Sequence, residues 1–332
     1  MTNEEFDLRL KLKIKPECLI EDPPPITDLI YPSFQRYPLN SPDTYSYNAP
    51  IEYGGHWYLY DQNRMLHVFS HDFSIRTRSV QSNAPAGSVI KVKDSDRATK
   101  FLGGQHFKSA FNSDYECKYY KSTDGVSWYP SFLDRQVQGE DANMIQIDSD
   151  PNRIINFIRP SRIRDIGVQS ISLLNGKVTP SGIRSILLRR NEAPPKDLYC
   201  ACPIVVDSNA TVANCLVFVA KYRKGNMGQD SDQMPPYTTD EHTVDTYLYY
   251  YVGSTGEMYI LNDGRPIIDR EVLSLRPEQQ LYIWATLFEE NIVMNVSTST
   301  SKHVISQPQI LETRIYTWKL SDALAFVRKA GL

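Results

Sequence analysis

The ten residues YYKSTDGVSW, Tyr119 to Trp128, contain the pattern that decides the fold. An alternating segment rich in aromatic residues runs into a Ser-Thr-Asp-Gly turn, and a second apolar segment begins at the tryptophan. Alternation with a period of two indicates a β-strand, and Asp-Gly is a strong turn signal between strands. The stretch therefore predicts two antiparallel strands joined by a tight turn.

The same arrangement of strand, polar turn and strand recurs along the chain. The turns are marked by Asp72, Asp124, Asn175, Thr255 and Asp322, which are 52, 51, 80 and 67 residues apart. A polar insertion at 223–245, rich in Gly and Pro, explains the longest step. Repeats of about 40–50 residues with four strands each are typical of propellers. We therefore predict an all-β, five-bladed β-propeller over 45–332; the alternative is a β-sandwich or two unrelated β domains.

Two of the units can be divided into strands from the inside outward. The predicted strands of the third unit are DANMIQID (141–148), NRIINFIRP (152–160), IGVQSISLL (166–174) and GIRSILLR (182–189). Those of the fourth unit are YCACPIVVD (199–207), CLVFVAKYR (215–223), TYLYYYVG (246–253) and REVLSL (270–275). Each segment is short, and most contain the β-branched and aromatic residues that strands favour.

The two ends of the chain lie outside this repeat. Residues 1–44 form a predicted N-terminal arm, in which LRLKLKIK (8–15) alternates and is expected to add a strand to the last blade and close the ring. The tail SDALAFVRKAGL (321–332) predicts either a helix capped by Ser321 or a last turn and strand.

Composition excludes several classes of function. The net charge of −3 and 23% charged residues argue against an electrostatic nucleic-acid surface. The N-terminus has no secretory signal, and no apolar run reaches the length of a membrane span. Five cysteines form an odd set, so a reduced, cytoplasmic or intracellular location is expected. Cys200 and Cys202 would face one side of a strand, and we interpret them as packing residues; no metal or cofactor is predicted.

Propellers bind ligands at the mouth of the central channel, where the inner strands start. Polar residues that open predicted inner strands are Asn48 in the first unit, Asp141 beside Glu140 in the third, and Asp197 with Tyr199 in the fourth. Two carboxylates on neighbouring blades could act as the acid and the base or nucleophile of glycosidic cleavage, so Asp141 and Asp197 are the catalytic candidates.

The substrate-binding candidates are Arg159, Arg162, Tyr199 and His303. Arginines can bind carboxylates or hydroxyls of a sugar, and aromatic rings can stack on it. The structural alternatives are that Asp141 caps a turn and that Arg159 forms an ion pair between blades.

Several segments resemble the five-bladed propeller glycoside hydrolases. Residues 139–176, which begin GEDANMIQID, are similar to their third blade, in which Asp-Ala-x-Asn precedes a strand ending in Arg-Pro and an arginine-rich turn. PPKDLYCACPIVV (194–206) is similar to the next inner strand, and ETRIYTWKLSDALAFVRKAG (312–331) to the closing strand and turn. The resemblance covers 45–330 and implies that the six candidate residues lie at or near a sugar-binding mouth. The Asn-Asp-Pro-Asn, Arg-Asp-Pro and Glu-Cys motifs of the sucrose- and fructan-cleaving branch are absent.

These observations predict a carbohydrate-binding propeller that hydrolyses or phosphorolyses its ligand at the channel mouth. The expected partners are a carbohydrate or small-molecule ligand and, in a second interpretation, other proteins of an assembly. That second interpretation is a non-catalytic structural or adaptor subunit, for example of a viral particle. A sialidase-like lectin is a third interpretation, because YYKSTDGVSW is one residue short of an Asp-box.

Overall fold

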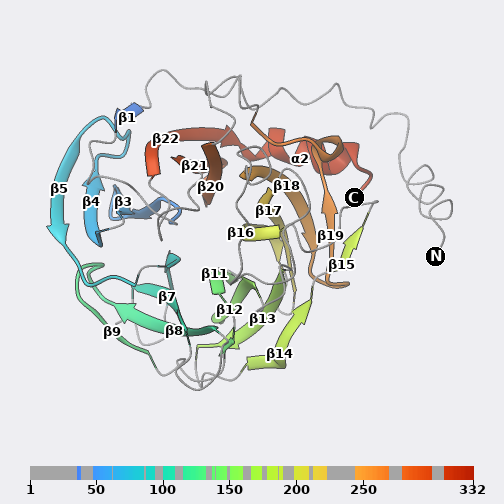
Figure 1. Ribbon diagram of the computed structural model, residues 1–332, viewed down its shortest axis with the longest axis horizontal. Helices are drawn as coiled ribbons and strands as arrows, with labels where there is room; N and C mark the ends of the chain where they lie inside the picture. Colours follow the sequence, from blue (N-terminus) through green and yellow to red (C-terminus); the bar gives the residue numbers. More distant parts are fainter. Residues whose placement is uncertain are drawn as a thin grey trace, which may run out of the picture.

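Five β-sheets form a ring around a central axis in the computed structural model of the chain (Figure 1). The structure describes residues 36–38, 48–61, 63–85, 87–93, 100–108, 115–131, 137–138, 140–147, 150–159, 166–173, 178–185, 187–189, 198–208, 212–222, 244–268, 279–300 and 310–332. Each sheet is one blade, whose principal strands run outward from the axis in chain order. The predicted all-β, five-bladed propeller is confirmed.

The first three blades follow one another along the chain. Blade 1 contains β2 (Ile51–Tyr53), β3 (His56–Tyr60), β4 (Met65–Phe69) and β5 (Arg76–Gln81). Blade 2 contains β6 (Val89–Lys91), β7 (Phe101–Lys108) and β8 (Tyr115–Ser122), with β9 (Trp128–Pro130) and β10 (Val137–Gln138) both paired to β8. Blade 3 contains β11 (Glu140–Ile147), β12 (Asp150–Arg159), β13 (Gly167–Ser172) and β14 (Val178–Ser185).

The last two blades complete the ring. Blade 4 contains β16 (Leu198–Ser208), β17 (Ala213–Tyr222), β18 (Val244–Val252) and β19 (Glu257–Ile260), with β15 (Leu187–Arg189) parallel to β19. The 3₁₀ helix η4 (Asn262–Gly264) follows β19. Blade 5 contains β20 (Gln279–Phe288), β21 (Asn291–Thr300) and β22 (Ile310–Lys319), with β1 (Arg36–Pro38) on the edge of β22, and the helix α2 (Leu320–Lys329) ends the chain.

Three of the four strand predictions for the third blade are confirmed. Its outermost strand, predicted at 182–189, is β14 at Val178–Ser185, and Leu187–Arg189 instead forms β15 beside β19 of blade 4. One strand of the fourth blade was also wrongly assigned. REVLSL (270–275) was predicted to be outermost, but β19 occupies the fourth position, immediately after the Gly-Ser-Thr-Gly turn. Residues 270–275 themselves lie outside the described residues. The short segment Glu257–Ile260 pairs with β18 because the tight turn leads directly back along it.

The predictions for the two ends of the chain have different outcomes. LRLKLKIK (8–15) lies outside the described residues, so its closure of the ring stays a prediction; the segment paired with β22 is Arg36–Pro38. The tail is a helix, but Ser321 does not cap it. The helix begins at Leu320 after Lys319, and the Ser321 hydroxyl donates to Asp322 Oδ1 at 3.2 Å. Of the predicted insertion 223–245, the last two residues belong to β18.

Apolar clusters hold neighbouring blades together at each of the five junctions. Phe101 and Trp128 pack with Tyr60 between blades 1 and 2, and Tyr119 packs with Ile154 between blades 2 and 3. Further clusters join blades 3 and 4 and blades 4 and 5, where Trp318 also contacts α2. Between blades 5 and 1, the cluster includes Trp57, Leu59, Phe69, Phe73, Val293 and Ile315. The ring is therefore continuous through side-chain packing, and burial of this apolar area is its main stabilising term.

The Asp124 turn that the sequence singled out joins β8 to β9. Asp124 Oδ1 accepts the backbone N–H groups of Val126 and Ser127, both at 2.8 Å, and the Ser122 hydroxyl at 3.0 Å. The Trp128 indole N–H donates to the Gly125 carbonyl at 3.0 Å. These bonds hold the turn while the tryptophan ring enters the core between blades 1 and 2. The predicted pair of strands with a tight turn is confirmed.

Candidate functional site

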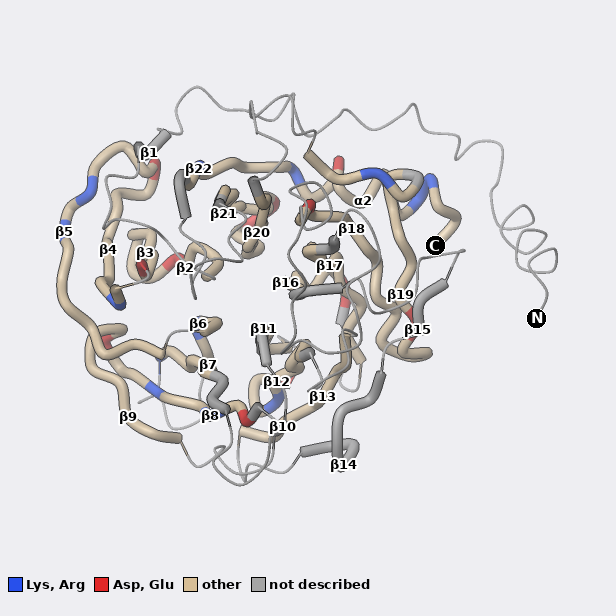
Figure 2. The backbone as a smooth tube through the Cα atoms, in the orientation of Figure 1, with Lys and Arg blue, Asp and Glu red and all other residues tan. Residues whose placement is uncertain are grey.

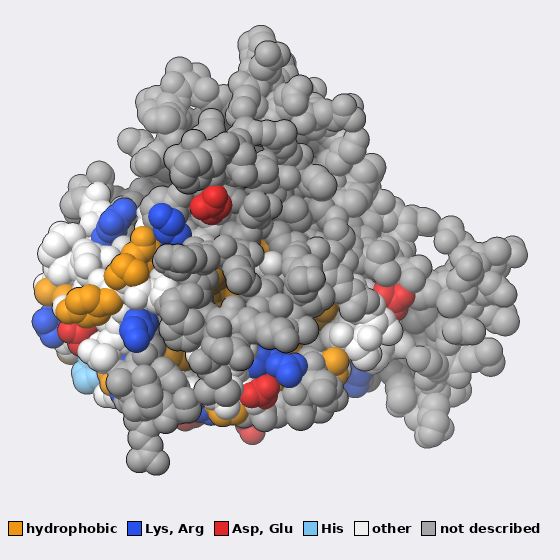
Figure 3. Space-filling view, turned by 90° about the horizontal axis from the view of Figure 1, so that it is seen from below, with side chains coloured by type: hydrophobic (Ala, Val, Ile, Leu, Met, Phe, Trp, Pro, Cys, Tyr) orange, Lys and Arg blue, Asp and Glu red, His pale blue; other side chains and the backbone are white. Residues whose placement is uncertain are grey.

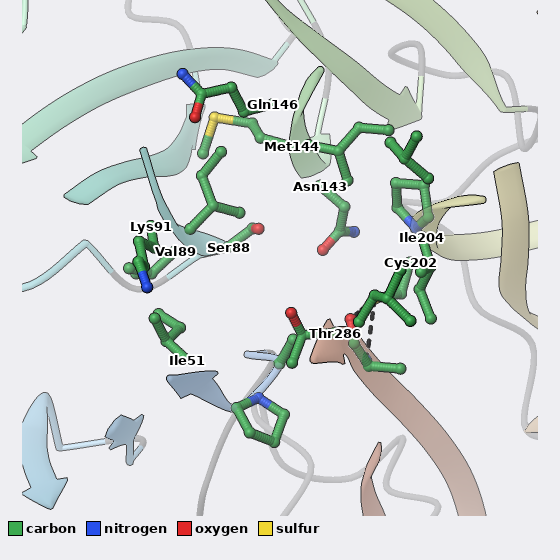
Figure 4. Close-up of a pocket in the computed structure, with 18 of the residues that line it drawn as sticks. Ile51, Ser88, Val89, Lys91, Asn143, Met144, Gln146, Cys202, Ile204 and Thr286 are labelled. Carbon is green, nitrogen blue, oxygen red and sulfur yellow. Dashed lines mark hydrogen bonds between the residues drawn. The ribbon is translucent and has the colours of Figure 1, made fainter. Parts of the chain in front are cut away.

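An open cavity of about 300 Å³ lies on the axis of the ring (Figure 4). It is lined by residues 49–52, 88–91 and 93, 143–146, 202–205 and 285–288. These five stretches lie on or beside β2, β6, β11, β16 and β20, the innermost strand of each blade. All five blades therefore contribute to one cavity, which identifies it as the central channel.

The described lining of the cavity lies partway along the long inner strands. It includes Asn143 in β11, Cys202 in β16 and Ala285 in β20. The predicted mouth residues Asp141 and Tyr199 stand earlier on β11 and β16.

Polar groups from three blades are directed toward the open space. Figure 4 shows the side-chain amide of Asn143 and the hydroxyls of Ser88 and Thr286 facing it. Ile51, Val89, Met144 and Ile204 line the wall between them. A few convergent polar groups set in an apolar wall are typical of sites for small ligands, and the volume is at the lower end of the usual range.

A charged pair joins the first two blades at the edge of this cavity. Lys91 Nζ donates to Glu52 Oε2 at 3.0 Å and to the Glu52 carbonyl at 3.1 Å, and the Gly55 N–H donates to Glu52 Oε1 at 3.0 Å. Burial alone raises the pKa of the Glu52 carboxyl, but the hydrogen bonds from Gly55 and Lys91 outweigh it, so the pKa is below its usual value. Glu52 is therefore an ionised acceptor and is unsuited to act as a general acid.

Other side chains at the wall of the channel connect blades. Gln146 Nε2 donates to the carbonyls of Lys93 (2.7 Å) and Pro151 (2.6 Å), and Gln146 Oε1 accepts the Lys93 N–H at 2.6 Å. Cys202 Sγ accepts the Ala285 N–H at 3.2 Å. Burial raises the pKa of the Cys202 thiol to about 12, which makes it a poor nucleophile. The hydrogen bonds of Gln146 and Cys202 stabilise the wall of the channel, so we expect a ligand to contact the other polar side chains that line it.

Asn48 was expected to open the first inner strand at the mouth, and its side chain is instead buried. Asn48 Oδ1 accepts the Val89 N–H at 2.9 Å, and the Asn48 carbonyl accepts Asn295 Nδ2 at 3.0 Å. One residue therefore connects blade 1 to blades 2 and 5. A short amide side chain suits this role because it can accept a hydrogen bond without bringing a buried charge.

The structure describes only part of the predicted site. Asp141, Arg159 and Tyr199 lie on β11, β12 and β16, and their side chains are outside the described part. The register of β11 and β12 pairs Glu140 with Arg159, so the backbones of Asp141 and Arg159 are near each other at one end of blade 3. Asp197, Arg162 and His303 lie outside the described residues. The catalytic and substrate-binding roles of the six residues stay predictions.

Sequence reasoning missed Glu52, Lys91, Asn143 and Thr286. Asn143 and Thr286 lie inside strands, whereas the predicted candidates were chosen near strand starts and ends. Glu52 in APIEYGG carried a usable signal, since a carboxylate in a predicted inner strand must face either the channel or a partner.

The described part of the chain contains neither a metal-binding cluster nor a membrane-spanning helix. No three His, Cys, Asp or Glu side chains there gather into a group that could hold a metal ion. No helix in that part is long and apolar enough to cross a membrane.

The fold and the cavity together define a five-bladed propeller with an open axial channel. No protein-family profile and no curated protein match the chain. Among solved structures, a Bombyx mori GH32 β-fructofuranosidase is 11% identical, with 93% of this chain and 70% of that chain covered and a TM-score of 0.45. A B. megaterium levansucrase is 10% identical, with 92% of each chain covered and a TM-score of 0.44.

A Kuenenia stuttgartiensis hydrazine synthase is also similar, at 10% identity and a TM-score of 0.39, with 76% of this chain covered. This chain spans 63% of the length of that chain. Glycoside hydrolase propellers are thus among the structural neighbours. Each of these TM-scores is below 0.5, and the five-bladed fold follows from the sheet topology of the chain itself.

Proposed function

We propose that the protein is a carbohydrate-binding propeller whose ligand occupies the axial channel. The observation that supports this is the open cavity itself, bounded by the inner strands of all five blades. Its wall combines apolar side chains with the amide of Asn143 and the hydroxyls of Ser88 and Thr286 (Figure 4). Such groups can exchange hydrogen bonds with sugar hydroxyls, and the ion pair of Glu52 with Lys91 adds a charged acceptor and donor.

We propose hydrolysis only through Asp141 and Asp197, whose catalytic roles are predictions from the sequence. Glycosidic cleavage needs two carboxyl groups, one of them protonated, about 5–10 Å apart. Glu52 is the only carboxylate among the described lining residues, and its lowered pKa makes it an unsuitable acid. Asp141 and Asp197, which open the inner strands predicted from the sequence of the third and fourth units, are therefore the proposed acid pair.

Binding can be tested through the Thr286 hydroxyl. Isothermal titration with a panel of methyl glycosides and oligosaccharides, guided by a glycan array, should identify a saccharide ligand. Thr286→Val keeps the shape of the side chain and removes one hydroxyl, so affinity should fall about 2- to 10-fold. Thr255→Val, in the turn between β18 and β19, is the matched control and should leave the affinity unchanged.

The failure of either step would count against the proposal. If no saccharide binds, or if Thr286→Val leaves the affinity of a bound saccharide unchanged, the channel is not the sugar site. For a sugar that the protein cleaves, Asp141→Asn and Asp197→Asn should each abolish turnover while binding persists. Turnover that survives in both variants would contradict their catalytic roles.

The alternative of a structural or adaptor subunit has no specific observation in its favour. An assembly surface is expected to expose contiguous apolar area. Among the described residues the exposed large apolar side chains are Ile75, Tyr129 and Leu332. On the described part of the face in Figure 3, apolar side chains lie beside basic ones.

A further inference from the structure

Blade 1 carries a Ser-His-Asp array that is separate from the channel. Ser79 Oγ lies 2.9 Å from His67 Nδ1, and His67 Nε2 lies 3.1 Å from Asp61 Oδ2. His67 and Ser79 face each other across the ladder of β4 and β5, where the register pairs them directly. A nucleophile, a base within hydrogen-bond reach and a third group that orients the base are the three parts of an activated serine.

The burial of the three side chains suits these roles. Asp61 and His67 are 4% and 2% exposed, whereas Ser79 is an exposed residue of the outer strand β5. Asp61 Oδ1 accepts the backbone N–H groups of Asn63 and Met65, both at 2.8 Å, so the carboxylate has a fixed orientation. The base is therefore held in a fixed orientation and shielded from solvent, while the serine is an exposed residue whose hydroxyl bond to His67 is partly buried.

The tautomer of the imidazole follows from the two partners. A carboxylate only accepts hydrogen bonds, so in the neutral imidazole the proton resides on Nε2 and is donated to Asp61. Nδ1 then carries the lone pair and accepts the proton of the Ser79 hydroxyl. In serine proteases Nδ1 bonds to the aspartate and Nε2 to the serine. Here the two ring nitrogens have the opposite partners, and each partner still has a nitrogen of its own.

We propose that Ser79 is a nucleophile toward small acyl esters, with His67 as its general base and Asp61 as a positioning residue. The Ser79 oxygen bonds to the ester carbonyl carbon and its proton moves to His67 Nδ1. The C–O bond to the alcohol breaks and the alcohol leaves with that proton. Water, deprotonated by the same nitrogen, then hydrolyses the acyl-serine to the carboxylic acid and restores the hydroxyl.

The position of the array limits the substrate. In the described part of the chain β5 pairs on one side only, with β4, so its outer edge presents backbone N–H groups that could stabilise an oxyanion. No residue of the array lines the channel cavity. Small, unhindered esters that approach an edge strand from solvent are therefore the expected class, independent of any sugar in the channel.

A fluorophosphonate probe tests this proposal directly on the intact chain. Attack by Ser79 forms an O–P bond and expels fluoride, and mass spectrometry of the peptides locates the adduct. We expect the adduct on Ser79, and its rate of formation should fall about 100-fold or more in His67→Gln, since a general base contributes at least that factor. Hydrolysis of p-nitrophenyl acetate should be lost in Ser79→Ala.

Ser74→Ala is the matched control, because Ser74 is an exposed serine whose hydroxyl donates to the carboxylate of Asp72 at 2.7 Å instead of to an imidazole. Labelling and hydrolysis should persist in this variant. In Asp61→Asn the rate of adduct formation should also fall, because the imidazole loses the carboxylate that fixes its orientation; this readout also serves if His67→Gln does not fold. No adduct on Ser79, or an unchanged rate in Asp61→Asn, would overturn the proposal.

Discussion

At the scale of single residues, the turn after β8 illustrates how one backbone conformation determines local packing. Gly125 has φ +75°, a region in which side chains are strained, and the Tyr60 hydroxyl donates to its carbonyl at 2.8 Å. The Trp128 indole donates to the same carbonyl. Two aromatic side chains from different blades thus converge on one peptide group, and glycine lets them approach.

We predict that Gly125→Ala destabilises the protein more than an equivalent change in open space. A Cβ there would lie 2.9 Å from Tyr60 Oη and 3.4 Å from the Tyr58 ring, in addition to the strain of positive φ. The free energy of unfolding, measured by denaturant titration, should fall by about 2–4 kcal/mol.

Gly55→Ala is the control that separates backbone strain from the close contact with Tyr60 in the destabilisation expected for Gly125→Ala. Gly55 has φ +79°, and no atom lies within 4 Å of the position that a Cβ would take there. This variant should lose only about 1–2 kcal/mol, from backbone strain alone. Equal losses in the two variants would show that the contact with Tyr60 costs nothing.

At the scale of elements, β2 and β6 are joined by both apolar packing and the ion pair of Glu52 with Lys91. The side chain of Lys91 is 45% exposed and that of Glu52 is 18% exposed, so solvent screens much of the attraction between them. Acidic and basic positions are scattered around the ring rather than gathered in one blade (Figure 2). The ion pair therefore makes a small contribution to the stability of this junction, and the apolar cluster between blades 1 and 2 supplies most of it.

The Glu52 link predicts a defined dependence on pH. Because the pKa of Glu52 is lower in the folded than in the unfolded chain, its stabilisation is present above the usual value of 4.5 and is lost as pH falls through the folded pKa. The difference in unfolding free energy between the native protein and Glu52→Gln should be below about 1 kcal/mol at neutral pH and should shrink in acid.

Urea titrations of both proteins between neutral pH and about pH 3 provide the measurement. Added salt should reduce the neutral-pH difference, because the pair is partly exposed. A difference that grows on acidification would contradict the assigned direction of the pKa.

At the scale of the whole molecule, three buried cysteine thiols lie at three different junctions between blades of the ring. Cys117 lies in the cluster between blades 2 and 3, Cys215 between blades 3 and 4, and Cys202 between blades 4 and 5. Burial raises the pKa of Cys117 and Cys202 to about 12 and that of Cys215 further. Thiolates are the reactive form, so all three are inert while the junctions stay closed.

We predict that iodoacetamide modifies these three cysteines only after global unfolding, and at one common rate. The apolar clusters make each blade depend on its neighbours, so opening one junction removes support from the next. Labelling at increasing denaturant, quantified for each peptide by mass spectrometry, gives the three rates separately. Early labelling of one thiol would show that its junction opens independently of the ring.

Much of the fold could be predicted because it depends on local patterns. The Asp124 turn and the first three strands of the third blade follow from alternation and turn chemistry, which act over a few residues. The fourth strand of blade 4 could not be assigned in this way, because both Glu257–Ile260 and 270–275 have short apolar runs and only pairing with β18 decides between them. Ser321 failed as a cap because the helix already begins at Leu320, with Lys319 at the cap position and Ser321 inside the first turn.

The candidate site was less accessible to sequence reasoning. Asp141, Arg159 and Tyr199 were placed on strands of the right blades, whereas Asn143 and Thr286 required knowledge of which strand faces reach the axis. The sequence by itself determined that the chain is a wheel of β-blades with tight polar turns, because periodicity and turn residues act locally. Tertiary structure alone decided that the channel is open and that Asn48 is a buried link. It also brought Ser79, His67 and Asp61 together, because these features depend on which side chains meet across strands and blades.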